Sequence, residues 1–272
     1  MHRPRWIPAD VDLDRPNPAR ILDYFLGGAH NFAVDRRAAK QAVQAMPEVA
    51  NGMRASRSFL RRAVTALVEA GVDQFLDLGS GIPTVGNVHE IAHRLAPDAR
   101  VVYVDNEPIA VAHSRTILGA NPLVASVRAD LRHPDSVLNL PAVRDMIDFS
   151  RPVGLIAIAV LHYLPDDDDP QGLVEAYRTA LAPGSFLALS HATVDFVPED
   201  QLPGVSRVEG IYRQISAQLH PRPYGEVAKF FTGLDLVPPG VVPVRQWRSE
   251  WSEQNEGKVH LSYGGVGHKP CL

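Results

Sequence analysis

The segment from residue 74 to residue 84 constrains the fold of this chain more than any other. Residues 74–79 form a short, mostly apolar run, which predicts a buried β-strand. The run breaks into Gly79-Ser80-Gly81, and apolar residues at helical spacing follow from Val85 onward. A strand, a glycine turn and a helix in this order leave backbone N–H groups and a helix N-terminus facing a ligand. The segment therefore predicts an α/β fold with a binding site at the end of this strand.

Two acidic residues mark the ends of the first two predicted strands. Asp77 lies near the end of the first strand, where a charge is costly unless it has a partner. Asp105 ends the second strand, residues 100–105, at about the spacing where dinucleotide-binding folds place a carboxylate on a ribose. The nicotinamide pattern G-x-G-x-x-G fails, because Thr84 occupies the position of its third glycine. The turn therefore favours a nucleoside ligand without a diphosphate, and a nicotinamide-dependent oxidoreductase, NAD(P)-linked, is the alternative.

Strand and helix patterns alternate through the rest of the chain. The predicted strands cover residues 74–79, 100–105, 123–128, 153–160 and 185–191. The predicted helices after the first strand cover residues 84–95, 107–118, 134–147, 171–182, 206–219 and 224–232. Repeated strand–helix units predict a doubly wound, parallel sheet. Two β-rich segments, 234–247 and 258–266, predict an antiparallel pair at its C-terminal end.

The first 72 residues predict a separate helical part. Residues 1–16 are rich in proline and charge, without periodicity, and predict an extended arm. Asn17-Pro18 then begins a helix that Gly27-Gly28 ends, and two further helices follow near 34–46 and 49–70. We therefore predict an arm and helical cap over residues 1–72 and a ligand-binding domain over residues 73–272.

The motif Asp77-Leu78-Gly79-Ser80-Gly81, followed by Asp105, resembles the class I S-adenosylmethionine (SAM) methyltransferases. The segments 20–28 and 31–36 narrow the resemblance to a bacterial family labelled S-adenosyl methyltransferase, and the segments 57–60, 236–240 and 263–267 extend it over nearly the whole chain. The resemblance implies a Rossmann-like, seven-stranded α/β sheet with an N-terminal helical cap, SAM as cofactor and methyl transfer as the reaction. It does not supply the methyl acceptor.

The resemblance also implies which residues bind the cofactor. Asp77 would orient its amino group, or else cap the glycine turn. Asp105 would accept hydrogen bonds from both ribose hydroxyls, or else cap the following helix. Asp130 would accept from the adenine amino group, while the Leu131 N–H meets a ring nitrogen, or else these residues form another strand-end turn. The remaining expected cofactor-binding residues are Gly79, Ser80, Gly81, Asn106, Val160 and Leu161 in the domain and Tyr24, Asn31, Phe32 and Arg57 in the cap.

A cofactor pocket built only from strand ends would be open to water, and methyl transfer proceeds best where water is excluded. The segment 17–60 offers an apolar helix face, a glycine turn, and polar and aromatic groups after it. We therefore expect this segment to pack over the carboxyl ends of strands one and four and to touch the cofactor. The alternative is a helical appendage that stabilises the far side of the sheet or forms a dimer interface.

The residues at the end of the fourth predicted strand indicate which class of methyl acceptor to expect. Enzymes that methylate base nitrogens or glutamine amides resemble one another in an Asn/Asp-Pro-Pro-aromatic tip, and residues 162–165 read HYLP instead. C5-cytosine methylation needs an attacking thiolate, and Cys271, near the C-terminus, is no candidate. Both absences favour a small-molecule acceptor. The candidate catalytic residues are His162, His191 and Tyr163, because they follow adjacent strands at the ligand-binding edge; a structural role is the alternative for each.

Composition limits which other classes of protein function are compatible with this sequence. A net charge of −4 argues against sequence-independent nucleic-acid binding, and the longest apolar run, 155–161, is far short of a membrane span. The single cysteine and an N-terminus without the apolar stretch of a signal peptide favour a cytoplasmic protein. Four acids at 166–169 favour a solvated turn over a metal site. A SAM-binding regulator or partner subunit without turnover is the alternative to an enzyme, and the oligomeric state is left open.

Overall fold

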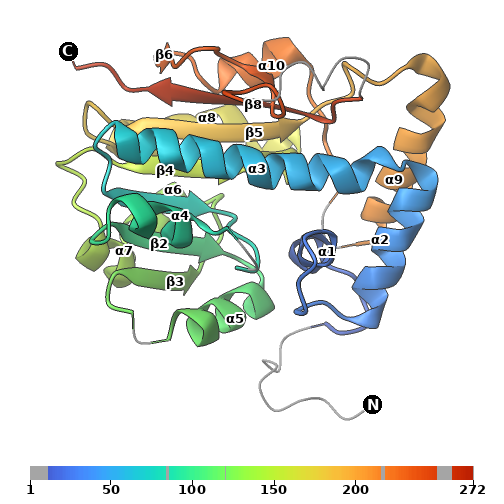
Figure 1. Ribbon diagram of the computed structural model, residues 1–272, viewed down its shortest axis with the longest axis horizontal. Helices are drawn as coiled ribbons and strands as arrows, with labels where there is room; N and C mark the ends of the chain where they lie inside the picture. Colours follow the sequence, from blue (N-terminus) through green and yellow to red (C-terminus); the bar gives the residue numbers. More distant parts are fainter. Residues whose placement is uncertain (1–11, 84–85, 120, 216–217, 250–258, 272) are drawn as a thin grey trace.

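A computed structural model describes residues 12–83, 86–119, 121–215, 218–249 and 259–271. A central β-sheet runs through it, with helices packed against the sheet (Figure 1). The strands are β1 (Gln74–Leu78), β2 (Arg100–Asp105), β3 (Val124–Arg128), β4 (Gly154–Ile158), β5 (Phe186–Ala192), β6 (Asp235–Leu236), β7 (Val242–Pro243) and β8 (Ser262–His268). Their order across the sheet is β3-β2-β1-β4-β5-β8-β6, with β7 also paired to β8. The predicted doubly wound α/β fold is confirmed.

The order of the strands places the ligand-binding edge. β1 to β5 run parallel, whereas β8 runs antiparallel to β5. All five residues of β1 are buried, as expected for a strand in the middle of a covered sheet. The chain runs outward from β1 through β2 to β3 and then returns to place β4 on the other side of β1. Open α/β sheets bind ligands beyond the carboxyl ends of their strands at such a reversal.

The helices differ from the predicted ones mainly at their ends. Their bounds are α1 (Pro18–Phe25), α2 (Ala33–Ala45), α3 (Glu48–Glu69), α4 (Val88–Leu95), α5 (Pro108–Leu118), α6 (Pro134–Leu138), α7 (Pro141–Met146), α8 (Pro170–Ala180), α9 (Leu202–Arg213) and α10 (Tyr224–Lys229). The predicted helix 134–147 is two helices, because Pro141 cannot donate to the turn before it and starts a new one. The predicted helix 206–219 lies earlier, as α9. Residues 84–85, the expected start of α4, lie outside the described part.

In the described residues, the C-terminal edge of the sheet contains three strands rather than two. β6 and β7 are two-residue strands that both pair with β8, so the described sheet has eight strands instead of the expected seven. Between β6 and β7 stand Pro238 and Pro239, which have no N–H for a ladder. Glycines in β8 allow close packing: a Cβ on Gly264 would lie 2.8 Å from the Val244 side chain. Packing therefore explains at least part of the glycine-rich ending of the chain.

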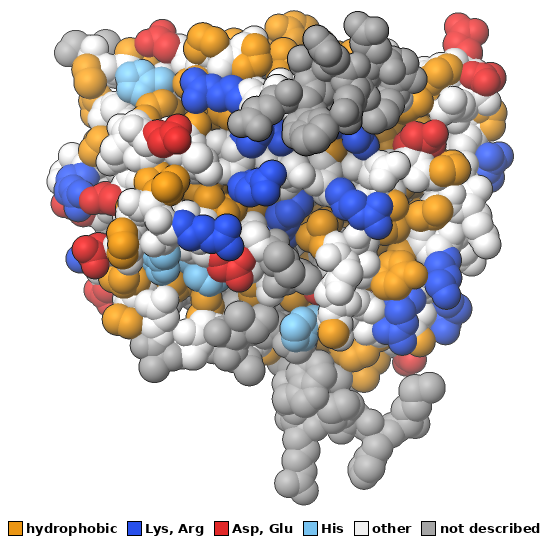
Figure 2. Space-filling model, in the orientation of Figure 1, with side chains coloured by type: hydrophobic (Ala, Val, Ile, Leu, Met, Phe, Trp, Pro, Cys, Tyr) orange, Lys and Arg blue, Asp and Glu red, His pale blue; other side chains and the backbone are white. Residues whose placement is uncertain are grey.

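α3 lies along one face of the sheet (Figure 1). Phe59 and Leu67 of α3 are fully buried against Phe75 of β1 in one hydrophobic cluster. Arg62 attaches the same helix to the C-terminal segment by donating to the carbonyls of Val244 and Trp247, at 2.6 and 2.7 Å. Figure 2 shows basic side chains distributed over this face among hydrophobic and uncharged ones. None of the helices in the described ranges is long and apolar enough to span a membrane.

The helical cap is built from two parts of the chain that are distant in sequence. α1, α2 and the first turn of α3 bury one cluster of side chains together with α9, which follows β5 in the sequence. Its core residues are Ile21, Phe25, Ala38, Ala39, Ala42, Met46, Val49, Val208, Tyr212 and Ile215. α3 therefore serves the cap at its N-terminal end and the sheet along the rest of its length. The predicted cap, residues 1–72, did not include α9.

A buried ionic network joins the cap to the end of β2. Arg20 of α1 donates from Nε to both carboxylate oxygens of Asp35, at 3.0 and 3.1 Å, and both side chains are buried. The Arg20 guanidinium also lies 3.5 Å from the Glu107 carboxylate. Asn17, the N-cap of α1, donates to Glu107 at 2.6 Å. Because Glu107 is two residues after Asp105, this network fixes α1 beside one of the predicted ligand-binding acids.

Candidate active site

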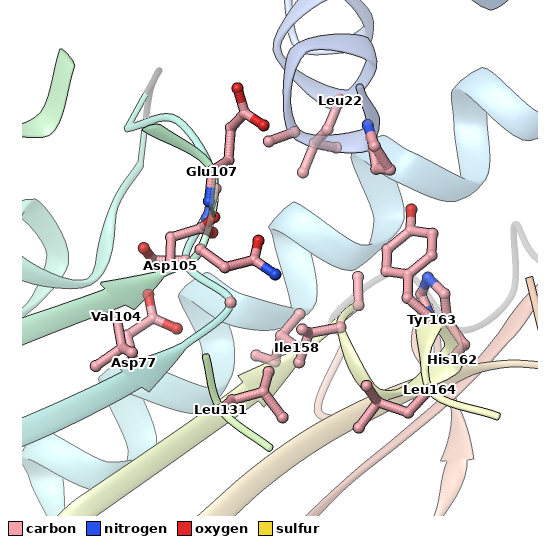
Figure 3. A pocket seen from close by; sticks show the side chains of 18 of the residues that line it. Leu22, Asp77, Val104, Asp105, Glu107, Leu131, Ile158, His162, Tyr163 and Leu164 are labelled. Atoms are coloured by element: carbon pink, nitrogen blue, oxygen red, sulfur yellow. Dashed lines mark hydrogen bonds between the residues drawn. The ribbon is translucent and has the colours of Figure 1, made fainter. Parts of the chain in front are cut away.

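The main pocket lies where the cap meets the carboxyl ends of β1, β2 and β4. It has a volume of about 720 Å³, within the range of small-molecule and cofactor sites. α1 contributes Asn17, Pro18, Ala19 and Leu22, and α3 contributes Met53, Ser56, Arg57 and Leu60. Figure 3 shows Asp77 and Asp105 on one side, Tyr163 and His162 across from them, and Leu22 of α1 above. The structure therefore places α1 and α3 over the pocket, as expected of the cap segment 17–60.

The glycine turn after β1 forms part of the pocket wall. Gly79, Ser80 and Gly81 all line the pocket, and both glycines have positive φ angles, of 66° and 65°. A Cβ on Gly79 would lie 2.1 Å from Val160, so a side chain cannot fit there. The N–H groups of Gly79 and Ser80 donate to Val104, and that of Gly81 donates to Asp105. The expectation that these N–H groups face a ligand was therefore wrong, because they attach the turn to the end of β2.

Asp105 lies at the end of β2, and both of its carboxylate oxygens accept hydrogen bonds from backbone N–H groups. One oxygen accepts from the Gly81 N–H at 2.7 Å and the other from the Glu107 N–H at 2.8 Å. Burial raises the pKa of the Asp105 carboxyl, and these hydrogen bonds act in the opposite direction. The Asn106 N–H also acts on this carboxylate, which has about four acceptor positions and can therefore still accept from a ligand. The local turn and a ligand can therefore share this residue, and Asn106 beside it also lines the pocket.

Asp77 is a buried acid on the pocket wall without a hydrogen-bonding donor among the described residues. Burial raises its pKa to about 8, although the positive charge of Arg57 lowers it. Arg57, on α3, lines the same pocket and reaches the side-chain oxygen of Asn87 at 3.4 Å. The described N–H groups of the glycine turn bond elsewhere, so capping by Asp77 is not what is observed. Asp77 and Arg57 together offer one acidic and one basic group to a zwitterion.

Asp130 and Leu131 line the pocket beyond β3. Arg132 donates to both carboxylate oxygens of Asp130, at 2.6 to 3.0 Å, and this pairing lowers the pKa of Asp130. Within the described residues, the Leu131 N–H has no acceptor. The Leu131 carbonyl accepts from the Tyr177 hydroxyl. Arg132 is half-exposed, so its pairing with Asp130 is a weak surface contact that a ligand can replace.

His191 is bonded through both ring nitrogens. Nδ1 lies 2.9 Å from the Ala192 carbonyl, and Nε2 lies 2.9 Å from the Arg222 guanidinium. Arg222 only donates, so Nε2 accepts and the ring is neutral with its proton on Nδ1. Burial lowers the pKa of His191 to about 4. Its side chain is fully buried and does not line the main pocket, so the structural alternative describes His191 and no free nitrogen is left for a catalytic base.

His162 and Tyr163 do line the pocket, on the short 3-10 helix η1 (Leu161–Tyr163) after β4. The Nδ1 of His162 accepts from the Ala192 N–H at 3.4 Å, which leaves the proton on Nε2. Burial lowers the pKa of His162 well below its usual value. Burial also raises the pKa of Tyr163 well above its usual value. His162 is therefore a weak base whose Nε2 carries the proton, and Tyr163 keeps its phenol proton, so both side chains are suited to orienting an acceptor rather than to removing its proton.

Four of the expected cofactor-binding residues do not line this pocket. Leu161 is buried in the sheet core. In the cap, Asn31 bonds to Asp23 and Arg36, and Phe32 packs against the Arg20 guanidinium. Tyr24 lies beside a shallow cavity on the outer side of α1, α2 and α3. The signature to which Tyr24, Asn31 and Phe32 belong therefore shapes the cap, whereas Val160 lines the pocket.

Several pocket residues were not predicted. Gln218 and His220 come from the segment after α9, and Met53 and Ser56 from α3. They lack a strand-end pattern, and only the packing of the cap brings them to the pocket. His220 is held there by its N–H, which donates to the His162 carbonyl at 2.8 Å. A histidine in a proline-rich loop is the one signal that sequence analysis could have used.

The acidic run 166–169 has structural partners. Asp166 accepts from Arg222, Asp168 lies near Arg132, and Asp169 caps α8 by accepting from the Gly172 N–H. Within the described ranges, no cluster of three or more histidine, cysteine, aspartate or glutamate side chains is arranged to bind a metal ion.

The comparisons with known proteins agree with this geometry. Residues 4–270 match the family model described as S-adenosyl methyltransferase. A crystal structure of a DUF574-family protein from Streptomyces avermitilis MA-4680 is 40% identical, covers 95% of this chain and 99% of that chain, and has a TM-score of 0.89. A crystal structure of a proposed methyltransferase from Thermobifida fusca YX is 39% identical, covers 98% of this chain and 100% of that chain, and has a TM-score of 0.90. None of the curated proteins compared with the chain matches it.

The described pocket residues fit SAM. The volume is sufficient, the backbone of the turn at Gly79 and Gly81 lines the pocket, and the Asp105 carboxylate can accept from a ligand. The fold, the pocket and the match over residues 4–270 show that the chain belongs to the S-adenosyl methyltransferase family and is a SAM-dependent methyltransferase.

Proposed function

We propose that this methyltransferase transfers the methyl group of SAM to an oxygen or nitrogen atom of a small molecule. The main support is the enclosure of the pocket by the cap. α1 and α3 contribute to its wall together with the strand ends, and the segment after α9 adds Gln218 and His220. A pocket roofed in this way accommodates a compact acceptor better than an exposed side chain of a folded protein or a base in a duplex.

We assign the two ends of the cofactor from the chemistry of the wall. Asp105 would accept from the two ribose hydroxyls with its open acceptor positions. The Leu131 N–H would donate to an adenine ring nitrogen, and Asp130 would accept from the adenine amino group in place of Arg132. At the methionine end, Arg57 would bind the carboxylate and Asp77 the ammonium group. The remaining wall, at His162 and Tyr163, would face the acceptor.

SAM supplies an activated methyl group on a sulfonium ion. The acceptor atom forms a bond to the methyl carbon with its lone pair while the carbon–sulfur bond breaks, and the bonding electrons stay on sulfur. The acceptor then loses one proton to water. The protein's contribution is alignment and exclusion of bulk water, because the low pKa of both candidate histidines makes them weak bases and His191 is bonded through both ring nitrogens.

A labelling experiment tests this proposal. The protein is incubated with methyl-tritiated SAM and, in separate reactions, a panel of small phenols and amines, an unrelated protein mixture, or RNA and DNA fragments. We expect the label to transfer to a small molecule and to neither class of macromolecule. Transfer to the macromolecules would contradict the small-molecule acceptor. SAM binding without transfer to any acceptor would favour a SAM-binding regulator. The cytoplasmic location, proposed from cysteine usage, is tested separately by fractionation.

A further inference from the structure

A second cavity adjoins the main pocket on the side away from Asp105. It has a volume of about 100 Å³ and lies between α3, α9 and the carboxyl ends of β4 and β5. We call it the apolar chamber and define it by Met46, Val49, Val205, Val208, Tyr212 and Leu219, which line it. An apolar cavity of about 150 Å³ takes up benzene, so a chamber of about 100 Å³ that shares part of its wall with the main pocket accommodates part of a compact apolar group.

The chamber and the main pocket share part of their walls. Met53, Ser56, Ala159 and His162 line both cavities, which makes them the junction between the two. Ala159 at this junction has a φ angle of 57°, which a non-glycine residue rarely adopts. Its N–H is held by the Ser190 hydroxyl at 3.0 Å. Backbone strain of this kind clusters at functional sites, where the surrounding structure maintains it.

The charges around the chamber restrict what it can bind. His162 is neutral, and His191 behind it is bonded through both nitrogens. Glu209 of α9 is an acidic residue on the lining, and it would repel an anion. An apolar group without negative charge therefore fits the chamber, whereas a carboxylate or phosphate does not.

We propose that the apolar chamber binds the body of the methyl acceptor, a compact apolar molecule of about one ring without negative charge, and that its reacting atom lies at the junction formed by Ala159 and His162. This inference rests on the proposed function and adds the acceptor's class and position. SAM would occupy the main pocket, and the acceptor would reach the methyl group from the chamber side. The step itself is the methyl transfer described above, with the same proton passing to water.

The four methionines provide a direct test. Met46 lines only the chamber, Met53 lines both cavities, and Met146 lines neither. In protein labelled with ¹³C at the methionine methyl groups, we expect phenol to shift the Met46 and Met53 signals and to leave Met146 unchanged. Benzoate, its anionic counterpart, should shift neither. S-adenosylhomocysteine should shift Met53 and leave Met46 unchanged.

Two substitutions on α9 make the test specific. Val205→Trp fills the chamber, whereas Ile211→Trp places the same side chain on the same helix outside both cavities. We expect Val205→Trp to weaken phenol binding at least tenfold while S-adenosylhomocysteine still shifts Met53, and Ile211→Trp to leave both responses intact.

The outcomes separate this inference from the proposed function. No phenol response at Met46 in the wild-type protein, or an equal response to benzoate, would overturn the chamber as acceptor site, and this holds even if Val205→Trp does not fold. An unchanged phenol response in folded Val205→Trp would overturn it as well. Loss of the S-adenosylhomocysteine response at Met53 alone would instead contradict the cofactor placement.

Discussion

At the scale of single residues, burial of the Asp77 carboxyl group lowers the stability of the folded protein when the group is ionised, and the same group is proposed to bind SAM. Its carboxyl group is buried, without a hydrogen-bonding donor in the described part of the chain, and its pKa is raised to about 8 by burial. At neutral pH the group is therefore mostly protonated. A bound ammonium or sulfonium ion would favour the ionised form, because an opposite charge stabilises a carboxylate. SAM binding and loss of a proton from Asp77 are therefore expected to be coupled.

This coupling predicts that SAM affinity rises with pH between about 6 and 7.5, approaching tenfold per pH unit. The SAM amino group itself titrates near 8, so this range keeps it mostly protonated. Calorimetry in two buffers of different ionisation enthalpy should detect release of up to one proton per SAM. Asp77→Asn should bind SAM more weakly and without that proton release. Equal proton release by the variant and the wild-type protein would assign the proton to another group.

The same pKa predicts an effect on folding stability. The folded-state pKa of Asp77 lies above its unfolded value of 3.8, so the folded protein binds this proton more tightly. The stabilisation that this tighter proton binding gives to the folded state is fully present below pH 4 and is lost as the pH rises through 8. Asp77→Asn should therefore be more stable than the wild-type protein at pH 9, by on the order of a few kcal/mol, and the difference should shrink toward pH 4. Thermal unfolding across this range measures it.

The proposed role of Asp105 in holding the ribose predicts that its removal lowers the affinity for SAM. Replacing it with alanine removes two charge-assisted hydrogen bonds to the ribose, so SAM binding should weaken by about 2–4 kcal/mol. Asp98→Ala is the matched control, because Asp98 is an exposed acid just before the opposite end of β2. Calorimetry on both folded variants measures the effect. An Asp105→Ala protein that is folded and binds SAM as tightly as the wild type would place the ribose elsewhere.

Residues at strand ends were predictable from sequence, and residues that depend on the cap were not. Asp77, Asp105 and Asp130 each follow or end an apolar run, and parallel strands bring such positions to one edge of the sheet. His191 follows the same rule but turns its ring into a buried network with Arg222. The sequence shows the position along a strand but not which bonds a side chain makes. His220 has no pattern because it reaches the pocket from a loop.

At the scale of elements, the N-terminal helices were predicted correctly, but their partner was not. The apolar faces of α1 and α2 are visible in the sequence as periodic patterns. Their burial depends on Val208 and Tyr212 of α9, which are more than 150 residues away along the chain. Periodicity shows that a helix has an apolar face and does not show what covers it.

The ionic network between α1, α2 and the end of β2 predicts a strong effect on both folding and binding. Arg20→Met would leave Asp35 and Glu107 without their buried partner, at a cost of about 3–5 kcal/mol in unfolding free energy. SAM affinity should also fall, because α1 forms part of the pocket wall. Arg151→Met is the control, since its pair with Asp73 is half-exposed and should contribute about 0–1 kcal/mol. Denaturant unfolding and calorimetry measure the two effects, and equal losses from both variants would contradict a special role for the network.

At the scale of the whole molecule, the pocket joins parts of the chain that are distant in sequence. Its wall includes α1, α3, the ends of β1, β2, β3 and β4, and the segment after α9. A ligand that contacts all of them stabilises the cap and the sheet together, because it binds only the folded arrangement. Cofactor binding is therefore expected to affect the stability of the entire chain rather than of the glycine turn alone.

This predicts a cooperative response to SAM. At a SAM concentration 100 times the Kd, the stabilisation is about 2.7 kcal/mol, and for a chain of this length it raises Tm by roughly 5–10 °C. Hydrogen exchange should slow in α1 and α9 as well as in the loop after β1, because the cap closes on the same cofactor. NADH is the control: it should raise neither Tm nor protection, since the third glycine of the nicotinamide pattern is Thr84. Protection limited to the strand ends, with α1 and α9 exchanging as in the free protein, would show that the cap does not take part in binding the cofactor.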